Sequence, residues 1–168
     1  MYSPYSPNSP YYDVYREYSP IHAPVPAGLE PSCAQEALEL IKGAVQGERE
    51  DELFYQYLIS VASSREEQEI IASIRDDERK HNRMFRQIYR DFTGRELESG
   101  GGAPFARPGS YTEGLKQALF GELRAVEKYR KIRRCLTHGR YRDMLFEIIT
   151  DELKHSAKYN YLFTLNSR

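Results

Sequence analysis

Two short stretches of this chain repeat one pattern of residues that can bind metal. Residues 77–81 (DERKH) and 151–155 (DELKH) both read D-E-x-K-H and are 74 positions apart. The glutamate and the histidine of each copy are three residues apart, so in a helix they share one face and can hold the same ion. At the same offset Glu48 recurs as Glu122, about 30 residues before each motif.

This donor set predicts a dinuclear metal site. Four carboxylates in a helix-bundle interior would repel one another and would be costly to desolvate unless cations compensated them. Two divalent ions balance the four charges, and two imidazoles give each ion one neutral nitrogen. One Glu from each of two helices plus Glu-x-x-His from each of the other two is typical of di-iron carboxylate bundles. Mixed oxygen and nitrogen donors suit iron, with manganese as the alternative. The predicted metal ligands are Glu48, Glu78, His81, Glu122, Glu152 and His155.

Apolar residues in steps of three and four predict the helices that position these donors. Four amphipathic helices are expected at about 32–63, 65–92, 111–136 and 141–165. Short turns near Ser63 and His138 make two antiparallel hairpins. In each hairpin the two glutamates lie about 15 residues to either side of the turn, so they should stand at the same height.

The segment between the second and third helices, residues 94–110, is too rich in Gly and Pro to be helical. About 16 extended residues span up to about 55 Å, whereas a helix of about 27 residues is about 40 Å long. This segment can therefore cross the whole bundle, so that the second and third helices run in parallel. We predict an all-α, ferritin-like four-helix bundle with a long crossover between helices two and three.

The stretches GEREDELFYQYL, DERKH, GELRAVEKY and DELKH resemble the ligand motifs of the ferritin-like superfamily, which includes rubrerythrins and bacterioferritins. The resemblance covers about residues 32–165. It implies that Glu78 and Glu152 bridge the two ions and that Glu48 and Glu122 are terminal ligands. It also implies that Asp77 and Asp151 accept the second N–H of the ligand imidazoles.

The sequence departs from rubrerythrins in two ways. Rubrerythrins usually carry a rubredoxin-like domain with two C-x-x-C pairs, which this sequence lacks, so we expect an external electron donor. Their third helix has an extra ligand Glu three residues after the first, and here that position is Ala125. Asp51 and Glu52 could add a carboxylate to the first half of the site, but we expect both on a solvated face.

Tyr55 and Tyr129 follow Glu48 and Glu122 by seven residues, two turns along the same helix face. Each could donate a hydrogen bond to a ligand carboxylate or supply an oxidisable phenol. An ordinary core tyrosine is an equally good interpretation of both.

Residues 1–31 differ in composition from the bundle at 32–168. They hold six Tyr in the first 18 positions and most of the chain's nine Pro. This predicts an extended, Tyr/Pro-rich N-terminal arm. A disordered tail and an arm that packs on a subunit or partner both fit that composition.

The bulk composition narrows the classes of partner and compartment. The 24 basic and 25 acidic residues nearly balance, so we expect no nucleic-acid and no membrane partner. No secretory signal pattern is evident at the N-terminus. Cys33 and Cys135 are expected to be lone thiols, which suits a reducing cytoplasm. We predict a cytoplasmic homo-oligomer, either a dimer or a larger assembly.

These features predict a di-iron carboxylate oxidoreductase that reacts with O₂ or H₂O₂, either as a ferroxidase acting on Fe²⁺ or as a peroxide reductase. One alternative is a dimanganese catalase. Another is a metal-stabilised structural or binding protein that acts through its N-terminal arm.

Overall fold

The computed structural model describes residues 27–46, 48–98 and 105–167, and leaves the side chains of residues 48 and 49 undescribed. Those ranges contain five helices and no strand. The helices are α2 (Ala34–Gln46), α3 (Glu48–Val61), α4 (Arg65–Thr93), α5 (Tyr111–Cys135) and α6 (Gly139–Asn166). Most of the predicted arm, residues 1–26, lies outside the described residues.

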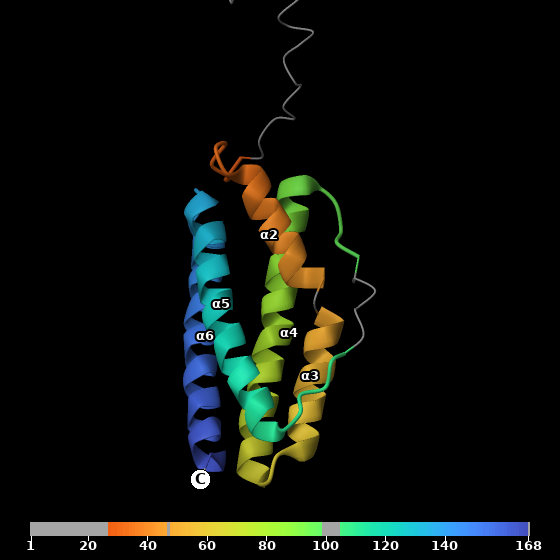
Figure 1. Cartoon of the computed structure of the whole chain (residues 1–168). Helices are drawn as coiled ribbons and strands as arrows, with labels where there is room; N and C mark the ends of the chain where they lie inside the picture. Colours follow the sequence, from red (N-terminus) through yellow and green to blue (C-terminus); the bar gives the residue numbers. More distant parts are fainter. Residues whose placement is uncertain (1–26, 47, 99–104, 168) are drawn as a thin grey trace, which may run out of the picture.

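The helices form a bundle with the predicted connectivity (Figure 1). The chain descends through α2 and α3 and returns along α4. The connection that follows Thr93 then leads back to the opposite end of the bundle, where α5 begins. Helices α4 and α5 therefore run in parallel, and α6 returns antiparallel to α5. The predicted all-helical, ferritin-like fold is confirmed.

The first predicted helix, 32–63, differs in one respect: it is two helices, α2 and α3. Residue 47, which separates them in the sequence, is outside the described residues. Helix α5 passes through Gly121, the repeat counterpart of residue 47, without a break. A poor helix former at this place in the repeat is therefore not sufficient to end a helix.

Serine side chains cap the N-termini of α4 and α5 and so fix where these two helices begin. Ser64 accepts a hydrogen bond from the Glu67 backbone N–H at 3.2 Å, and Ser110 does the same for Glu113 at 3.1 Å. Glu67 is buried at this end of the bundle and accepts hydrogen bonds from the Tyr111 hydroxyl at 2.7 Å and the Asn166 amide at 3.1 Å. One carboxylate thus joins the start of α4 to the start of α5 and the end of α6.

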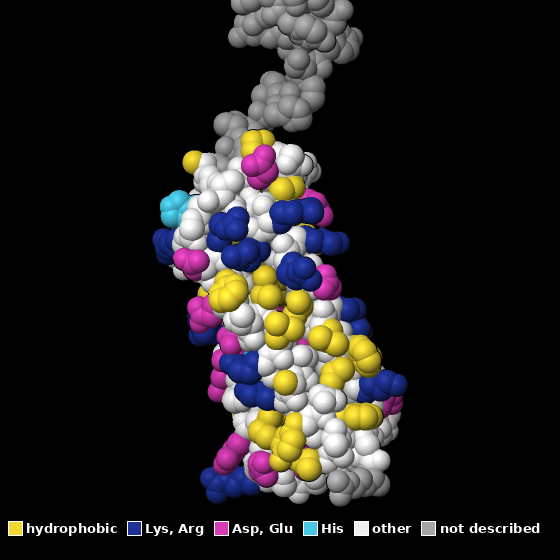
Figure 2. Space-filling view, turned by 90° about the vertical axis from the view of Figure 1, so that its left-hand side faces the viewer, with side chains coloured by type: hydrophobic (Ala, Val, Ile, Leu, Met, Phe, Trp, Pro, Cys, Tyr) yellow, Lys and Arg dark blue, Asp and Glu magenta, His cyan; other side chains and the backbone are white. Residues whose placement is uncertain are grey.

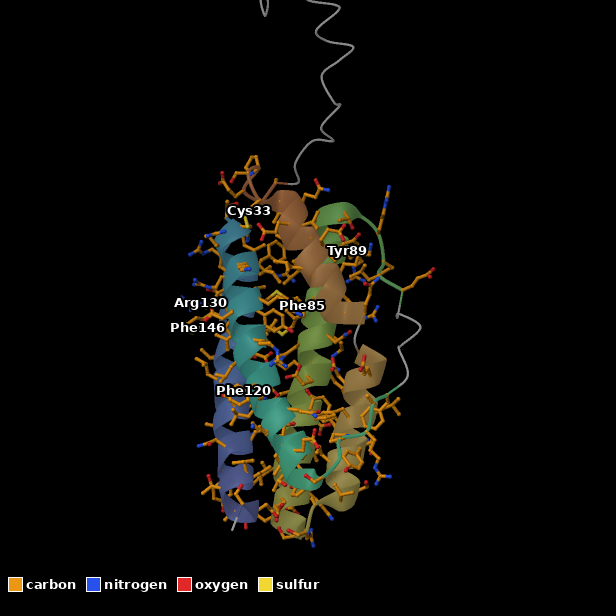
Figure 3. The ribbon with its side chains drawn as sticks, in the orientation of Figure 1. Cys33, Phe85, Tyr89, Phe120, Arg130 and Phe146 are labelled. Carbon is orange, nitrogen blue, oxygen red and sulfur yellow. A yellow bond between two sulfur atoms is a disulfide. The ribbon has the colours of Figure 1, made fainter. Side chains whose placement is uncertain are left out.

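The apolar core consists of two clusters. One includes Phe85, Tyr129 and Ile148 and lies toward the end where α2 begins; the other includes Leu58, Ile74 and Leu162. Phe85 lies in the bundle interior, where its ring centroid is 4.9 Å from that of Tyr129 (Figure 3). In sequence, the predicted metal-binding residues of α4, α5 and α6 fall between the parts of each helix that contribute to the two clusters.

The two cysteines are not lone thiols. Cys33 and Cys135, 102 positions apart, are joined in a disulfide. The crossover topology explains the contact, because it places the start of α2 beside the end of α5 (Figure 1). Backbone hydrogen bonds reinforce the join: the Glu30 N–H donates to the Cys135 carbonyl at 2.8 Å and the Thr137 N–H to the Gly28 carbonyl at 2.9 Å. Because the two cysteines are paired, they do not support a reducing compartment, and the cytoplasmic location stays a prediction.

The outer face of α5 and α6 carries apolar side chains in contact with solvent (Figure 2). Leu123, Phe146 and Leu153 are 40%, 57% and 48% exposed. Phe120, Phe146 and Arg130 point away from the bundle in Figure 3. In the described part of the chain, every helix is too short or too polar to cross a membrane.

Candidate metal centre

Helices α4, α5 and α6 bring most of the predicted ligands together. One donor atom from each of Glu78, Glu122, Glu152 and His155 lies within 4.8 Å of the others. Glu122, Glu152 and His155 are buried, and His81, also buried, is adjacent to them. Because the site lies at mid-bundle, no loop is needed to form it.

Each histidine faces the glutamate of the other motif copy. Nδ1 of His155 lies 3.1 Å from Oε1 of Glu78, and Nδ1 of His81 lies 3.3 Å from Oε1 of Glu152. His81 Nδ1 is also 3.6 Å from the second oxygen of Glu78, and His155 Nδ1 is 3.8 Å from Glu122. Glu78 therefore presents one oxygen to each imidazole.

These close atoms are not aligned as hydrogen bonds. Glu78 Oε1, His81 Nδ1, Glu152 Oε1 and His155 Nδ1 are all buried without a hydrogen-bond partner. A buried polar atom left unpaired in this way is costly. Metal ions bound at the centre that these four atoms face would satisfy all of them. The donor set therefore fits metal ions.

The outward-facing imidazole nitrogens pair with aspartates across the bundle. Nε2 of His81 on α4 lies 3.1 Å from Oδ2 of Asp151 on α6, and Nε2 of His155 on α6 lies 3.0 Å from Oδ2 of Asp77 on α4. An ionised aspartate can only accept, so each Nε2 carries the proton. With that proton fixed on Nε2, Nδ1 is the nitrogen of each ring that faces the centre and would bind metal.

The comparison with protein families agrees with this geometry. The rubrerythrin family model matches residues 39–162, which include α3, α4 and α5 in full and most of α2 and α6. The chain belongs to the rubrerythrin family. No curated protein and no solved structure matches the chain. Membership in this family of the ferritin-like superfamily adds independent support for a cluster that could hold metal.

Glu48, the first-helix ligand predicted for this rubrerythrin-family site, begins α3, but its side chain lies outside the described residues. Asp51, one turn later, lines two clefts that are also lined by Glu78. The surrounding protein, together with the charge of Glu78, raises the pKa of the Asp51 carboxyl to about 6. Glu52 instead turns away and pairs with Arg79 at the surface, as expected for a solvated residue.

Without metal, the site retains protons. Burial, with the charges of Glu78 and Asp51, raises the pKa of Glu122 to about 8, and burial likewise raises the pKa of Glu152 well above its usual value. Burial would lower the pKa of His81, but the carboxylates of Glu152 and Glu78 outweigh it and raise that pKa to about 10. Positive charge is thus already held where cations are predicted to bind.

The pKa values of Asp77 and Asp151, the aspartates that pair with the histidines, are lowered and not raised. Burial alone would raise the pKa of Asp151, but hydrogen bonds from Lys154 and His81 lower it to about 2. The pKa of Asp77 is also lowered, against burial, by hydrogen bonds from His155 and Lys154. Both groups are therefore ionised acceptors for the histidines at neutral pH.

Tyr55 and Tyr129 are buried and line both clefts that reach the site. Burial, followed by neighbouring site carboxylates, raises the pKa of each hydroxyl well above its usual value, so both stay protonated. Sequence reasoning missed Tyr159, whose hydroxyl is fully buried without a hydrogen-bond partner. The signal was available, because Tyr159 follows His155 by one helical turn.

Proposed function

We propose that this rubrerythrin-family protein is a dinuclear iron oxidoreductase that reacts with O₂ or H₂O₂, either as a ferroxidase or as a peroxide reductase. The observation that carries the proposal is the set of four buried, unpaired donor atoms, two carboxylate oxygens and two imidazole nitrogens, that face one centre. Family membership supports iron as the metal.

The geometry suggests how the donors would be shared. Glu78 offers one oxygen to the neighbourhood of each imidazole, which suits a carboxylate that bridges two ions. Glu152 approaches His81 closely and belongs to the same cluster as His155, so it would be the second bridge. Of the two imidazoles, Glu122 lies near that of His155, so it would be a terminal ligand, with Glu48 as its counterpart at the other ion.

Two ferrous ions held there would supply two electrons to the oxidant, one from each ion. The surrounding residues control access and protons. Both clefts at Asp51 would give small molecules a route to Glu78, and one of them is also lined by Glu122. Tyr55 and Tyr129, protonated at neutral pH, would donate hydrogen bonds to the ligand carboxylates or to the oxidant. The buried Tyr159 hydroxyl, in the same core cluster as Tyr55, would do the same.

Partners and assembly belong to the same proposal. The reaction consumes electrons, so we propose an external electron donor for the peroxide reaction and Fe²⁺ itself for the ferroxidase reaction. We also propose a homo-oligomer, since exposed apolar surface such as that of Phe146 and Leu153 is the kind that subunit contacts bury. Light scattering on the purified protein measures the assembly directly.

The test is anaerobic Fe²⁺ loading followed by exposure to each oxidant. We expect two irons per chain and an absorption change on mixing with O₂ or H₂O₂; the faster oxidant separates ferroxidase from peroxide reductase. Glu122→Ala should lose one of the two irons, whereas Glu127→Ala, at an exposed acid on the same helix paired with Arg130, should keep both. Fewer than one iron per chain, or no oxidation with either oxidant, would contradict the proposal.

A further inference from the structure

The repeated motif D-E-x-K-H contains a lysine that the metal-binding set does not use. Lys80 and Lys154 occupy equivalent positions in the two copies. Both are partly exposed at the edge of the bundle, 40% and 48% by side-chain area. Their surroundings differ, and the difference points to a function for only one of them.

Lys154 contacts both of the aspartates that hold the imidazoles. Its Nζ lies 2.6 Å from Oδ1 of Asp151 and 3.1 Å from Oδ2 of Asp77. These carboxylates belong to different helices and accept from different histidines, His81 and His155. One ammonium group therefore connects the supports of both predicted metal positions.

Lys80 does not mirror this arrangement. It pairs with Glu147, and its other ion pair, with Asp151 Oδ2, is long at 3.8 Å. The repeat explains why, because the position equivalent to Glu147 in the other half is Ser73. Ser73 carries no charge to attract Lys154, and it accepts a hydrogen bond from Lys158 instead, at 2.8 Å. The replacement of one acid by a serine thus leaves Lys154, and not Lys80, to join the two aspartates.

We propose that Lys154 is a positioning residue for the whole dinuclear centre. By holding Asp77 and Asp151 together it orients both imidazole rings so that both Nδ1 atoms face the metal ions. Without it, two partly buried carboxylates on neighbouring helices would repel each other, and the rings that depend on them would lose their orientation. This inference rests on the proposed function, because it assumes that the imidazoles bind metal.

The test measures Fe²⁺ affinity anaerobically, in competition with a chelator, on metal-free protein. Lys154→Met should bind both irons at least about tenfold more weakly, the range expected when a supporting group of a metal ligand is lost. Lys158→Met is the matched control, since it removes the same charge one turn away on the same helix. Lys154→Arg should keep most of the affinity, because a guanidinium can bind two carboxylates at once.

A second variant tests the explanation of the asymmetry. Adding Glu147→Ser to Lys154→Met frees Lys80, which should then pair with the aspartates and recover part of the lost affinity. Unchanged affinity in the double variant would contradict the explanation from Ser73. Far-UV circular dichroism of each metal-free variant should match the parent protein at the temperature of the binding assay, which separates a local effect from misfolding.

The possible outcomes separate a failure of the role proposed for Lys154 from a failure of the proposed iron site. Parent protein that binds two irons, with Lys154→Met equal to Lys158→Met, would overturn the inference alone. Parent protein that binds no iron would overturn both. A loss shared by both irons in Lys154→Met, restored by Lys154→Arg, would support it.

Discussion

His81 of α4 and Asp151 of α6 are 3.1 Å apart, and the same contact recurs between His155 of α6 and Asp77 of α4 at 3.0 Å. Each motif copy therefore supplies a histidine to its own half and an aspartate to the other half. The two hairpins hold each other's imidazoles in place, so a complete site forms only when α4 and α6 are packed together.

We predict that Asp77→Asn and Asp151→Asn each weaken Fe²⁺ binding by about 10- to 100-fold without loss of the fold. An amide keeps the size of the side chain but removes the charge that orients the imidazole N–H. Anaerobic titration with a competing chelator measures the change, and circular dichroism checks helicity. Asp76→Asn, at an exposed acid beside Asp77, is the matched control. Affinity equal to that control would show that these aspartates do not support the ligands.

We predict that removing the Glu78 side chain and removing the Glu122 side chain leave different numbers of iron ions bound. If Glu78 bridges, Glu78→Ala should abolish binding at both positions, because each ion loses an oxygen. Glu122→Ala should leave one iron bound, because of the two imidazoles Glu122 lies near that of His155. Iron counted per chain after loading and desalting decides between them. One iron retained by Glu78→Ala would refute the bridging assignment.

The stability of the metal-free protein should fall as the pH rises from about 6 to 8.5. Burial and nearby acids raise the pKa of Glu122 to about 8 in the folded protein. The stabilisation that follows is fully present below the ordinary pKa of 4.5 and is lost as the pH rises through 8. The pKa of His81 is raised to about 10, so its stabilisation of the folded state is fully present below pH 6.5 and is lost as the pH rises through 10. Each group changes the free energy of unfolding by at most about 1.4 kcal/mol per pH unit.

Urea denaturation at several pH values measures this dependence, and Glu122→Gln should flatten it. Asp151 acts only at low pH: its contribution is present above 3.8 and lost as the pH falls toward 2. Iron binding displaces the protons on Glu122 and His81, so iron affinity should rise with pH over the same range. Metal-free protein that becomes more stable between pH 6 and 8.5 would contradict this account.

Much of the fold and the site followed from the sequence because the repeat encodes both. The 74-residue offset aligned Glu122 with Glu48, and the Gly/Pro-rich segment 94–110 required a long connection, which left few topologies. The aspartate pairs cross from one repeat to the other, and no spacing within a single helix reveals such a contact. The sequence favoured a solvated face for Asp51, whereas the structure places its side chain among those that line the two clefts at Glu78.

The disulfide was missed for a related reason. Cys33 and Cys135 belong to no motif and are 102 positions apart, so their pairing depends on where the crossover places the ends of α2 and α5. The spacing of Tyr159 fits the apolar stripe of α6, so its position in the sequence does not distinguish it from an ordinary core residue. Its unpaired hydroxyl became evident only from its surroundings.

Reduction of the Cys33–Cys135 disulfide should lower the stability of the protein substantially. The bond closes a loop of about 100 residues, and constraining the unfolded chain by such a loop stabilises the native state by up to about 4.7 kcal/mol in the chain-entropy model. Urea denaturation with and without a dithiol reductant measures the difference, and Cys33→Ser/Cys135→Ser, which should not respond to reductant, is the control. Iron binding should persist after reduction, because the disulfide joins α2 to α5 at one end, whereas the described ligands lie mid-bundle on α4, α5 and α6. A denaturation midpoint that the reductant leaves unchanged would show that the bond does not constrain the unfolded chain.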